Sequence, residues 1–171
     1  MHIAKIVTLC IALSSCTTPP KYTLSELSEM TNRNYHSKTK EEIFIAADKL
    51  LRAVDRKNTE ISMFGEELRA ARTRFVLLNR LSYDWRIKVE QNGEITKVSA
   101  SVISRFDDME FRNTNGIGVY GLLFDRLDYL LGVRSEWTSC ESAQRVIDSK
   151  QRMATLDSLC LLSDDSKNPP K

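Results

Sequence analysis

The chain has 171 residues, which is enough for one domain with a hydrophobic core of its own. Its formal net charge is +2, so no basic excess indicates a nucleic-acid partner. The sequence contains no nucleophile motif, no metal-ligand spacing and no nucleotide-binding loop. We therefore expect a domain that is not an enzyme and that carries neither a cofactor nor a metal.

Residues 1–15 have the parts of an export signal. Lys5 lies near the start, and an apolar run from Ile6 to Leu13 follows that is too short to cross a bilayer. The run ends in Leu13-Ser14-Ser15-Cys16, which resembles a lipobox, the cleavage and acylation signal of bacterial lipoproteins. The alternative is an ordinary secretory signal in which Cys16 is incidental.

The lipobox resemblance implies how the protein is processed and where in the cell it is located. It implies that residues 1–15 are removed and that Cys16 carries a thioether-linked diacylglycerol and a further acyl chain such as palmitate. Two or three acyl chains hold a protein on a membrane almost permanently, whereas one chain binds only marginally. Because Thr17 rather than Asp follows the cysteine, the resemblance implies the outer membrane, with the protein facing the periplasm.

Residues 16–38 are predicted to be a lipidated, flexible tether. The stretch is polar, and Pro19-Pro20 near its start predicts an extended spacer. Leu24, Leu27 and Met30 have helical spacing, but a helix this short is marginal alone.

Residues 39–162 are predicted to form a single domain with two main helices. Thr39 and Glu42 match a capping box, and the apolar positions up to Val54 recur at helical spacing. A second amphipathic helix is expected from Val119 to Leu131, ended by a glycine. A third, weaker helix is expected over 141–153.

The strands are expected between the two main helices. Thr59–Phe64 alternates like a strand, 66–74 is ambiguous between helix and strand, and 75–78 is interpreted as a short buried strand. The clearest pattern is a hairpin in which 85–90 and 98–103 flank Asn92-Gly93, a pair that suits a type I′ turn. The acidic stretch 105–116 is interpreted as a solvated loop, with calcium binding as the weaker alternative.

These elements predict an α+β fold. We expect a small antiparallel sheet of about three or four strands packed against the two main helices. The result would be a helix-grip-like two-layer sandwich.

The C-terminal part contains the cysteines that an export signal would leave unmodified. Cys140 and Cys160 are predicted to form a disulfide, because an oxidising compartment favours pairing; free thiols or a metal pair are the alternatives. Trp85 and Trp137 are interpreted as core or disulfide-packing residues rather than the walls of a ligand groove. Residues 163–171 are predicted to be a disordered tail.

Two further resemblances bear on function. Residues 127–140, LDYLLGVRSEWTSC, are similar to a segment of a group of small proteobacterial lipoproteins with a helix–strands–helix core. The layout also resembles the helix-grip domains of lipoprotein subunits in outer-membrane assembly machinery, which is a likeness of architecture alone. Neither resemblance implies a functional residue beyond Cys16.

The hypothesis from the sequence is a membrane-anchored lipoprotein of the cell envelope. It would act as a non-enzymatic accessory or structural subunit of an envelope complex, with a protein partner in the envelope. The alternative is a periplasmic module that binds a lipid or another small ligand between the sheet and the last main helix.

Overall fold

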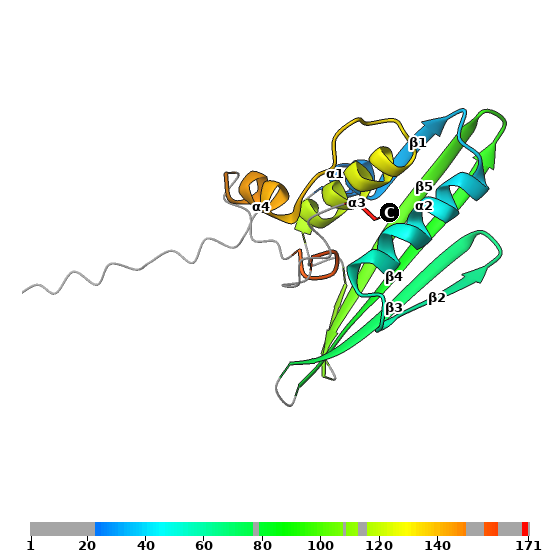
Figure 1. Cartoon of the computed structure of the whole chain (residues 1–171). Coiled ribbons are helices and arrows are strands. Elements are labelled where there is room, and N and C mark those ends of the chain that lie inside the picture. The colour runs from blue at the N-terminus through cyan, green and yellow to red at the C-terminus, as the bar shows by residue number, and fades with distance from the viewer. Residues whose placement is uncertain are drawn as a thin grey trace, which may run out of the picture.

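The computed structural model describes residues 23–76, 79–107, 109–112, 116–149, 156–160 and 169–170. Within these ranges the chain forms four helices and six strands (Figure 1). In chain order they are α1 (Leu24–Thr31), β1 (Asn32–His36), α2 (Lys40–Val54), β2 (Thr59–Phe64), β3 (Glu67–Val76), β4 (Asn79–Asn92), β5 (Ile95–Phe106), β6 (Met109–Arg112), α3 (Gly116–Leu130) and α4 (Cys140–Ser149).

All six strands belong to one antiparallel sheet. The strand order is β1-β5-β4-β3-β2, and β6 also pairs with β5. Two short strands share the outer edge of β5, because β1 pairs with Ile95–Ser99 and β6 pairs with Ile103–Phe106. The predicted α+β class and antiparallel sheet are confirmed, but the expected three or four strands and two main helices underestimate the fold.

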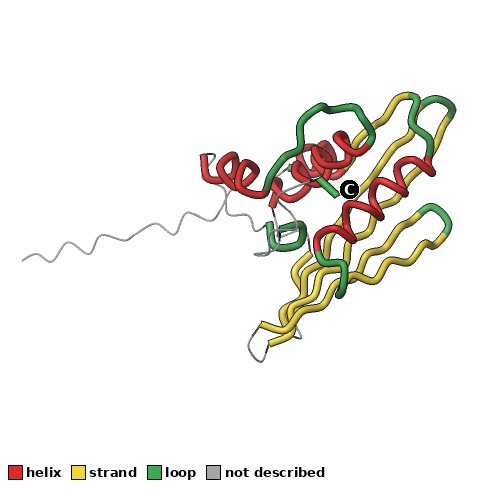
Figure 2. Tube along the Cα trace, viewed as in Figure 1, coloured by secondary structure: helices red, strands yellow, loops and turns green. Residues whose placement is uncertain are grey.

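The helices cover only one face of the sheet. Alternate residues of the three central strands are buried beneath them, and we call this set the covered face: Leu68, Ala70, Tyr83, Trp85, Ile87, Val89, Val98, Ala100 and Val102. Figures 1 and 2 show α2 and α3 lying across the same side of the sheet. The core therefore lies in one layer between sheet and helices, as a two-layer sandwich requires.

The helical layer is shorter than the sheet. The 14 residues of β4 span about 48 Å, whereas the 15 residues of α2 span about 22 Å. The end of the sheet where β3 and β4 meet extends past the helices (Figure 1). Phe75 and Val76, expected in a short buried strand over 75–78, form the end of β3. Phe75 is 74% exposed, so the expected burial is wrong for this residue, and residues 77 and 78 lie outside the described ranges.

The segment expected to be a tether contributes two elements to the domain. α1 begins with a capping box between Thr23 and Glu26, and β1 adds a strand to the sheet beside β5. From β1, Arg33 reaches α3, where its guanidinium lies 2.5 Å from the Asp128 carboxylate and 5.2 Å from the centre of the Phe124 ring. Residues 24–36 are thus part of the fold, and the predicted tether 16–38 extends too far.

The start of α2 and the end of α3 agree with the sequence prediction, whereas α3 begins at Gly116, three residues before the expected Val119. At the start of α2, the hydroxyl of Thr39 accepts a hydrogen bond from the Glu42 N–H, and the Glu42 carboxylate accepts one from the Thr39 N–H. After α3, Gly132 has a φ of +71°, and the N–H of Val133 donates to the Asp128 carbonyl. This is a Schellman ending, in which glycine adopts the left-handed backbone at no steric cost.

The predicted hairpin is confirmed, but its turn is of another type. Asn92 pairs with Ile95, so the two central turn residues are Gly93 and Glu94. Gly93 has a φ of +62°, and Glu94 is not among the described residues with positive φ. A single positive φ at the first central position is the pattern of a type II′ turn, which favours glycine there, rather than of the expected type I′.

Candidate functional site

The structure describes the predicted disulfide but not the predicted lipidation site. Cys16 lies outside the described residues, so its modification stays a prediction. Cys140 and Cys160 form a disulfide with their Cα atoms 5.9 Å apart, which confirms that pairing. His36 ends β1 and is exposed.

A buried arginine organises the region around the disulfide. Arg126 of α3 donates hydrogen bonds to the carbonyls of Thr138 and Leu159, each at 3.0 Å, and to the Sγ of Cys140 at 3.1 Å. Its guanidinium also lies 4.7 Å from the centre of the Trp137 ring. One cation thus holds α3, the connection to α4 and the segment 156–160 together.

A second buried arginine holds the same segment from the sheet. Arg72 of β3 donates to the carbonyl of Asp157, and the indole N–H of Trp85 donates to the carbonyl of Ser158 at 3.4 Å. Burial lowers the pKa of Arg126 to about 10 and also lowers the pKa of Arg72. Arg126 is still protonated at neutral pH, and the carbonyl dipoles and the π system around it help to offset its charge.

None of the described helices covers the opposite face of the sheet, which is densely polar. It contains the remaining alternate residues of the central strands, and we call this set the open face: Glu67, Arg69, Ala71, Thr73, Phe75, Ser82, Asp84, Arg86, Lys88, Glu90, Lys97, Ser99, Ser101, Ile103 and Arg105. Antiparallel sheets commonly keep one solvated face. In this sheet the solvated face carries several ion pairs at regular positions along the strands.

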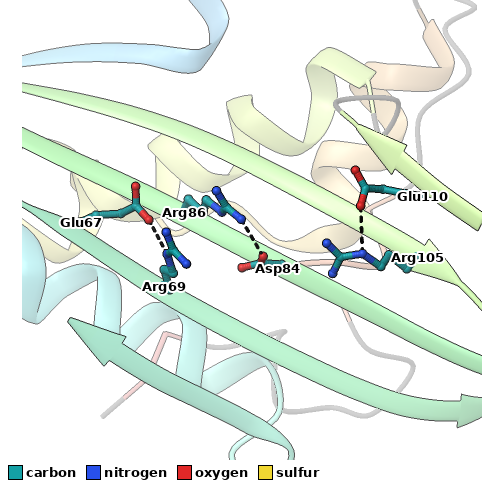
Figure 3. Close-up of polar contacts among 6 residues, drawn as sticks. All are labelled: Glu67, Arg69, Asp84, Arg86, Arg105 and Glu110. Atoms are coloured by element: carbon teal, nitrogen blue, oxygen red, sulfur yellow. Dashed lines mark hydrogen bonds and ion pairs between the residues drawn. The ribbon is translucent and has the colours of Figure 1, made fainter. Parts of the chain in front are cut away.

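Ion pairs run along the strands of the open face. Arg69 contacts Glu67 at 2.5 Å, and Arg86 contacts Asp84 at 3.4 Å, in both cases two residues apart on one strand. Arg105 contacts Glu110 of β6 at 3.1 Å (Figure 3). Each pair joins residues on the same face because side chains two apart along a strand point the same way.

The register places like charges side by side across the strands. Arg69 and Arg86 are direct partners in the β3–β4 pairing, and Figure 3 shows both side chains on the same face of the sheet. Hydrogen bonding to Glu67 raises the pKa of Arg69, so the acidic neighbour offsets the repulsion between the two cations. Two guanidinium groups flanked by two carboxylates form the centre of the open face.

Apolar side chains lie at the margin of the charged centre. Phe64 of β2 pairs with Glu67 and is 61% exposed, and the Arg69 guanidinium lies 5.4 Å from the centre of its ring. At the other end of β3, Phe75 is also exposed. Exposed aromatic rings beside arginines are typical of protein-binding surfaces.

The ligand-module alternative placed its site beneath Leu123 and Leu127 of α3. Both side chains are fully buried in the hydrophobic core. A hollow among the described residues lies elsewhere, on the outer side of α2, where Ile45 and Met63 contribute to its lining. In the parts of the chain that the structure describes, no three His, Cys, Asp or Glu residues are grouped so that they could hold a metal ion.

The sequence reasoning missed the open face and both buried arginines. The ion pairs had a visible signal, because Glu67/Arg69, Asp84/Arg86 and Lys88/Glu90 repeat opposite charges two residues apart. Arg126 had none, since an arginine beside an apolar helix stripe is usually solvated.

The chain matches no family model, no curated protein and no solved structure. Among the described residues, no helix is both long enough and apolar enough to cross a membrane.

Proposed function

We propose that this protein is a lipoprotein of the cell envelope, anchored by acylation at Cys16, that acts as a non-enzymatic accessory or structural subunit. In this proposal it binds a protein partner with the open face of its sheet. The membrane it occupies is the outer membrane, on the periplasmic side. The observation that carries the partner-binding role is the open face itself.

The anchoring part rests on the sequence and agrees with the cysteine chemistry. Leu13-Ser14-Ser15-Cys16 stands at the end of an apolar run of signal length. Disulfides persist in extracytoplasmic compartments and are rare where thiols are kept reduced. The Cys140–Cys160 disulfide therefore supports an exported protein.

The short distance between anchor and fold limits where a partner can bind. The described part of the chain begins at the N-cap Thr23, and seven peptide units separate this residue from Cys16. Fully extended, they reach about 25 Å. A lipid on Cys16 would therefore hold the domain close to the bilayer surface, and the partner would be a membrane protein or a protein at the same surface.

The chemistry of the open face supports a protein partner. Its five basic side chains are mixed with three acidic ones, and Arg69, Arg86 and Lys88 are each paired with a carboxylate. The open face therefore offers neither the extended basic footprint that nucleic acid requires nor a uniform field for one charged lipid. Paired charges with exposed Phe64 and Phe75 at the margin suit a partner with complementary charge and apolar pockets. Arginine and aromatic residues are enriched at such interfaces.

The anchoring claim is tested by Cys16→Ser. The full chain should incorporate labelled palmitate and remain with membranes after a high-salt wash, and the variant should lose the label and the lipid-dependent processing. A variant that is matured and retained as before would refute the anchoring claim.

The partner claim is tested by reversing charge at the centre of the open face. Arg69→Glu with Arg86→Glu should remove a stoichiometric partner from mild-detergent extracts, while Arg145→Glu on α4 should keep it. Equal recovery of the partner with both proteins would contradict the role of the open face, and a chain that purifies alone from several extracts would contradict a subunit role.

A further inference from the structure

A groove of about 1100 Å³ lies between the outer side of α2 and the end of β2. Phe44 contributes a largely buried aromatic ring to it, and Ile45 and Met63 contribute apolar side chains that are 68% and 54% exposed. Pro170 also lines it; of the predicted tail 163–171, the structure describes residues 169 and 170 alone. Because Ile45 and Met63 stay exposed, the groove is open to solvent and does not enclose a ligand.

The walls of the groove carry more positive than negative charge. Four basic and two acidic side chains line it, which gives a net charge of +2: Lys40, Lys49, Arg52, Arg56, Glu41 and Asp48. Two of the cations are already paired, Arg52 with Asp48 at 3.0 Å and Lys40 with a glutamate of the β2–β3 turn at 3.5 Å. Lys49 and Arg56 are exposed, and neither forms an ion pair with a residue that the structure describes. The groove therefore offers free cations beside apolar side chains.

β2, which contributes Met63 to the groove, is an edge strand. In the described sheet it pairs with β3 alone, and Figure 1 shows it as the outermost strand on its side. Phe64 and Glu67 flank the two-residue turn, the position of a hydrogen-bonded pair, and such pairs alternate with unbonded ones along a ladder. By this alternation, the backbone N–H and C=O groups of Ile61 and Met63 face the free edge.

The free edge of β2 has none of the usual protection against pairing. Edge strands are commonly blocked by lysine, by proline or by a bulge. Thr59–Phe64 contains neither residue type, and its register with β3 is unbroken. Glu60 is its one charged residue, so the strand can accept another extended chain.

A strand added beside β2 would use both the edge and the groove. Its main chain would gain hydrogen bonds, and every second side chain would point toward the helical side of the sheet. There Ile45 and Met63 offer apolar contacts, while Lys49 and Arg56 favour carboxylates.

The openness and the charge of the groove argue against two other occupants. An acyl chain would remain largely wet in an open groove, whereas small-ligand sites bury most of their ligand. Two copies of this chain joined through β2 would place the basic walls of their grooves side by side, and like charges repel.

We propose that the groove and the free edge of β2 form a binding site for an extended acidic segment of a second protein. The segment joins the sheet as a strand beside β2, with apolar side chains on Ile45 and Met63 and carboxylates near Lys49 and Arg56. The site is separate from the open face and does not require lipidation at Cys16.

Methyl NMR of the full chain in a neutral detergent, labelled at methionine and isoleucine, tests the proposal. The probe is a synthetic peptide that repeats Val-Val-Glu-Glu, so both of its faces carry apolar and acidic side chains when it is extended. It should shift the methyl signals of Met63 and Ile45 and leave those of Met109 and Ile147, on other elements, in place. No shift of Met63 and Ile45 would overturn the proposal.

The charge of the probe provides the first control. The matched peptide with lysine in place of glutamate should bind more weakly by about tenfold or more, because it meets the cations of the groove. Equal affinity of the two peptides would overturn the preference for an acidic segment.

Charge reversal in the protein provides the second control. Lys49→Glu with Arg56→Glu should weaken binding of the acidic peptide by about tenfold or more. Lys97→Glu with Arg145→Glu, at exposed positions outside the groove, changes the net charge equally and should leave the affinity unchanged. Equal losses in both double variants would overturn the groove as the site.

Pairing with β2 is tested by N-methylation of alternate residues of the acidic peptide. An added strand uses the N–H groups of every second residue on the edge that faces β2. Of two peptides methylated at the odd or at the even positions, one should therefore lose binding. Full binding by both would overturn strand addition.

Two further outcomes would reassign the occupant and so overturn the proposal. Larger shifts of Met63 and Ile45 with phosphatidylglycerol added to the detergent than with the acidic peptide would favour a lipid. Shifts of the same signals that depend on protein concentration, without peptide, would favour a second copy of the chain.

Discussion

The two faces of the sheet differ in chemistry although their residues alternate along the same strands. On β4, Trp85 and Ile87 point into the core, while Asp84 and Arg86, which alternate with them, point to the open face. The covered face is apolar, and the open face carries paired charges. Because burial and exposure alternate with a period of two, substitutions at neighbouring positions can separate stability from recognition.

The largest expected effect is at the covered face. Trp85→Ala should lower the free energy of unfolding by about 3–5 kcal/mol, because it removes a buried ring and leaves a cavity. It also removes the indole N–H that donates to the Ser158 carbonyl. Urea unfolding followed by circular dichroism measures this difference.

Arg86→Ala, one residue further along β4, is the matched control. Its ion pair with Asp84 is partly exposed, so the change should stay within about 0.5 kcal/mol. If Arg86→Ala lowered the free energy of unfolding as much as Trp85→Ala does, the open face would not be solvated as described.

The second effect concerns the disulfide. Replacing both Cys140 and Cys160 by serine should lower the free energy of unfolding by about 3 kcal/mol. The bond joins residues with a sequence separation of 20 and so restricts the unfolded chain. The same urea experiment measures it, with Cys16→Ser as a control that should leave the unfolding midpoint unchanged. Identical midpoints for the double variant and the unchanged chain would show that the bond adds nothing to stability.

The third effect concerns the buried Arg126. Arg126→Met keeps the apolar stem but leaves the Thr138 and Leu159 carbonyls without this donor, which should cost about 2–3 kcal/mol. Arg134→Met removes an exposed arginine that contacts Asp125 at 2.9 Å, and it should cost less than about 1 kcal/mol. If Arg126→Met lowered the free energy of unfolding less than Arg134→Met, Arg126 would not hold α3, the connection to α4 and the segment 156–160 together as described.

The smallest effect is a pH dependence at the start of α2. Hydrogen bonds from the backbone N–H and then from the hydroxyl of Thr39 hold the pKa of Glu42 below its usual value. The ionised form is therefore favoured in the folded state, so this stability is present above the unfolded pKa of about 4.3 and is lost as the pH falls through the folded pKa.

Glu42→Gln should flatten the dependence of the unfolding midpoint on pH between roughly 5 and 3. Glu41→Gln, one residue earlier and outside the capping box, is the control. The same flattening in both variants would show that the effect is one of net charge.

The elements with strong local patterns were predictable. The capping box of α2, the Gly132 ending of α3 and the β4–β5 hairpin all follow from residues within a few positions of each other. The hairpin turn differs in type because the register, which sequence alone does not fix, places Gly93 first in the turn.

The missing strands lack such local patterns. β1 is mostly polar and β6 has only four residues, and both pair with the edge of β5. The burial of Arg126 depends likewise on residues 156–160, which reach α3 from a distant part of the chain. Contacts between segments far apart in sequence therefore determine the place of β1 in the sheet and the burial of Arg126 beside the disulfide.

In-cell photo-crosslinking is the most direct test of the proposed function. A photoreactive amino acid at Ser101, on the open face, is compared with one at Val146, exposed on α4. The account predicts one discrete crosslinked envelope protein from Ser101, lost when Arg69 and Arg86 are both changed to Glu, and none from Val146. The same product from both positions, or a product from Val146 alone, would contradict the open face as the binding surface.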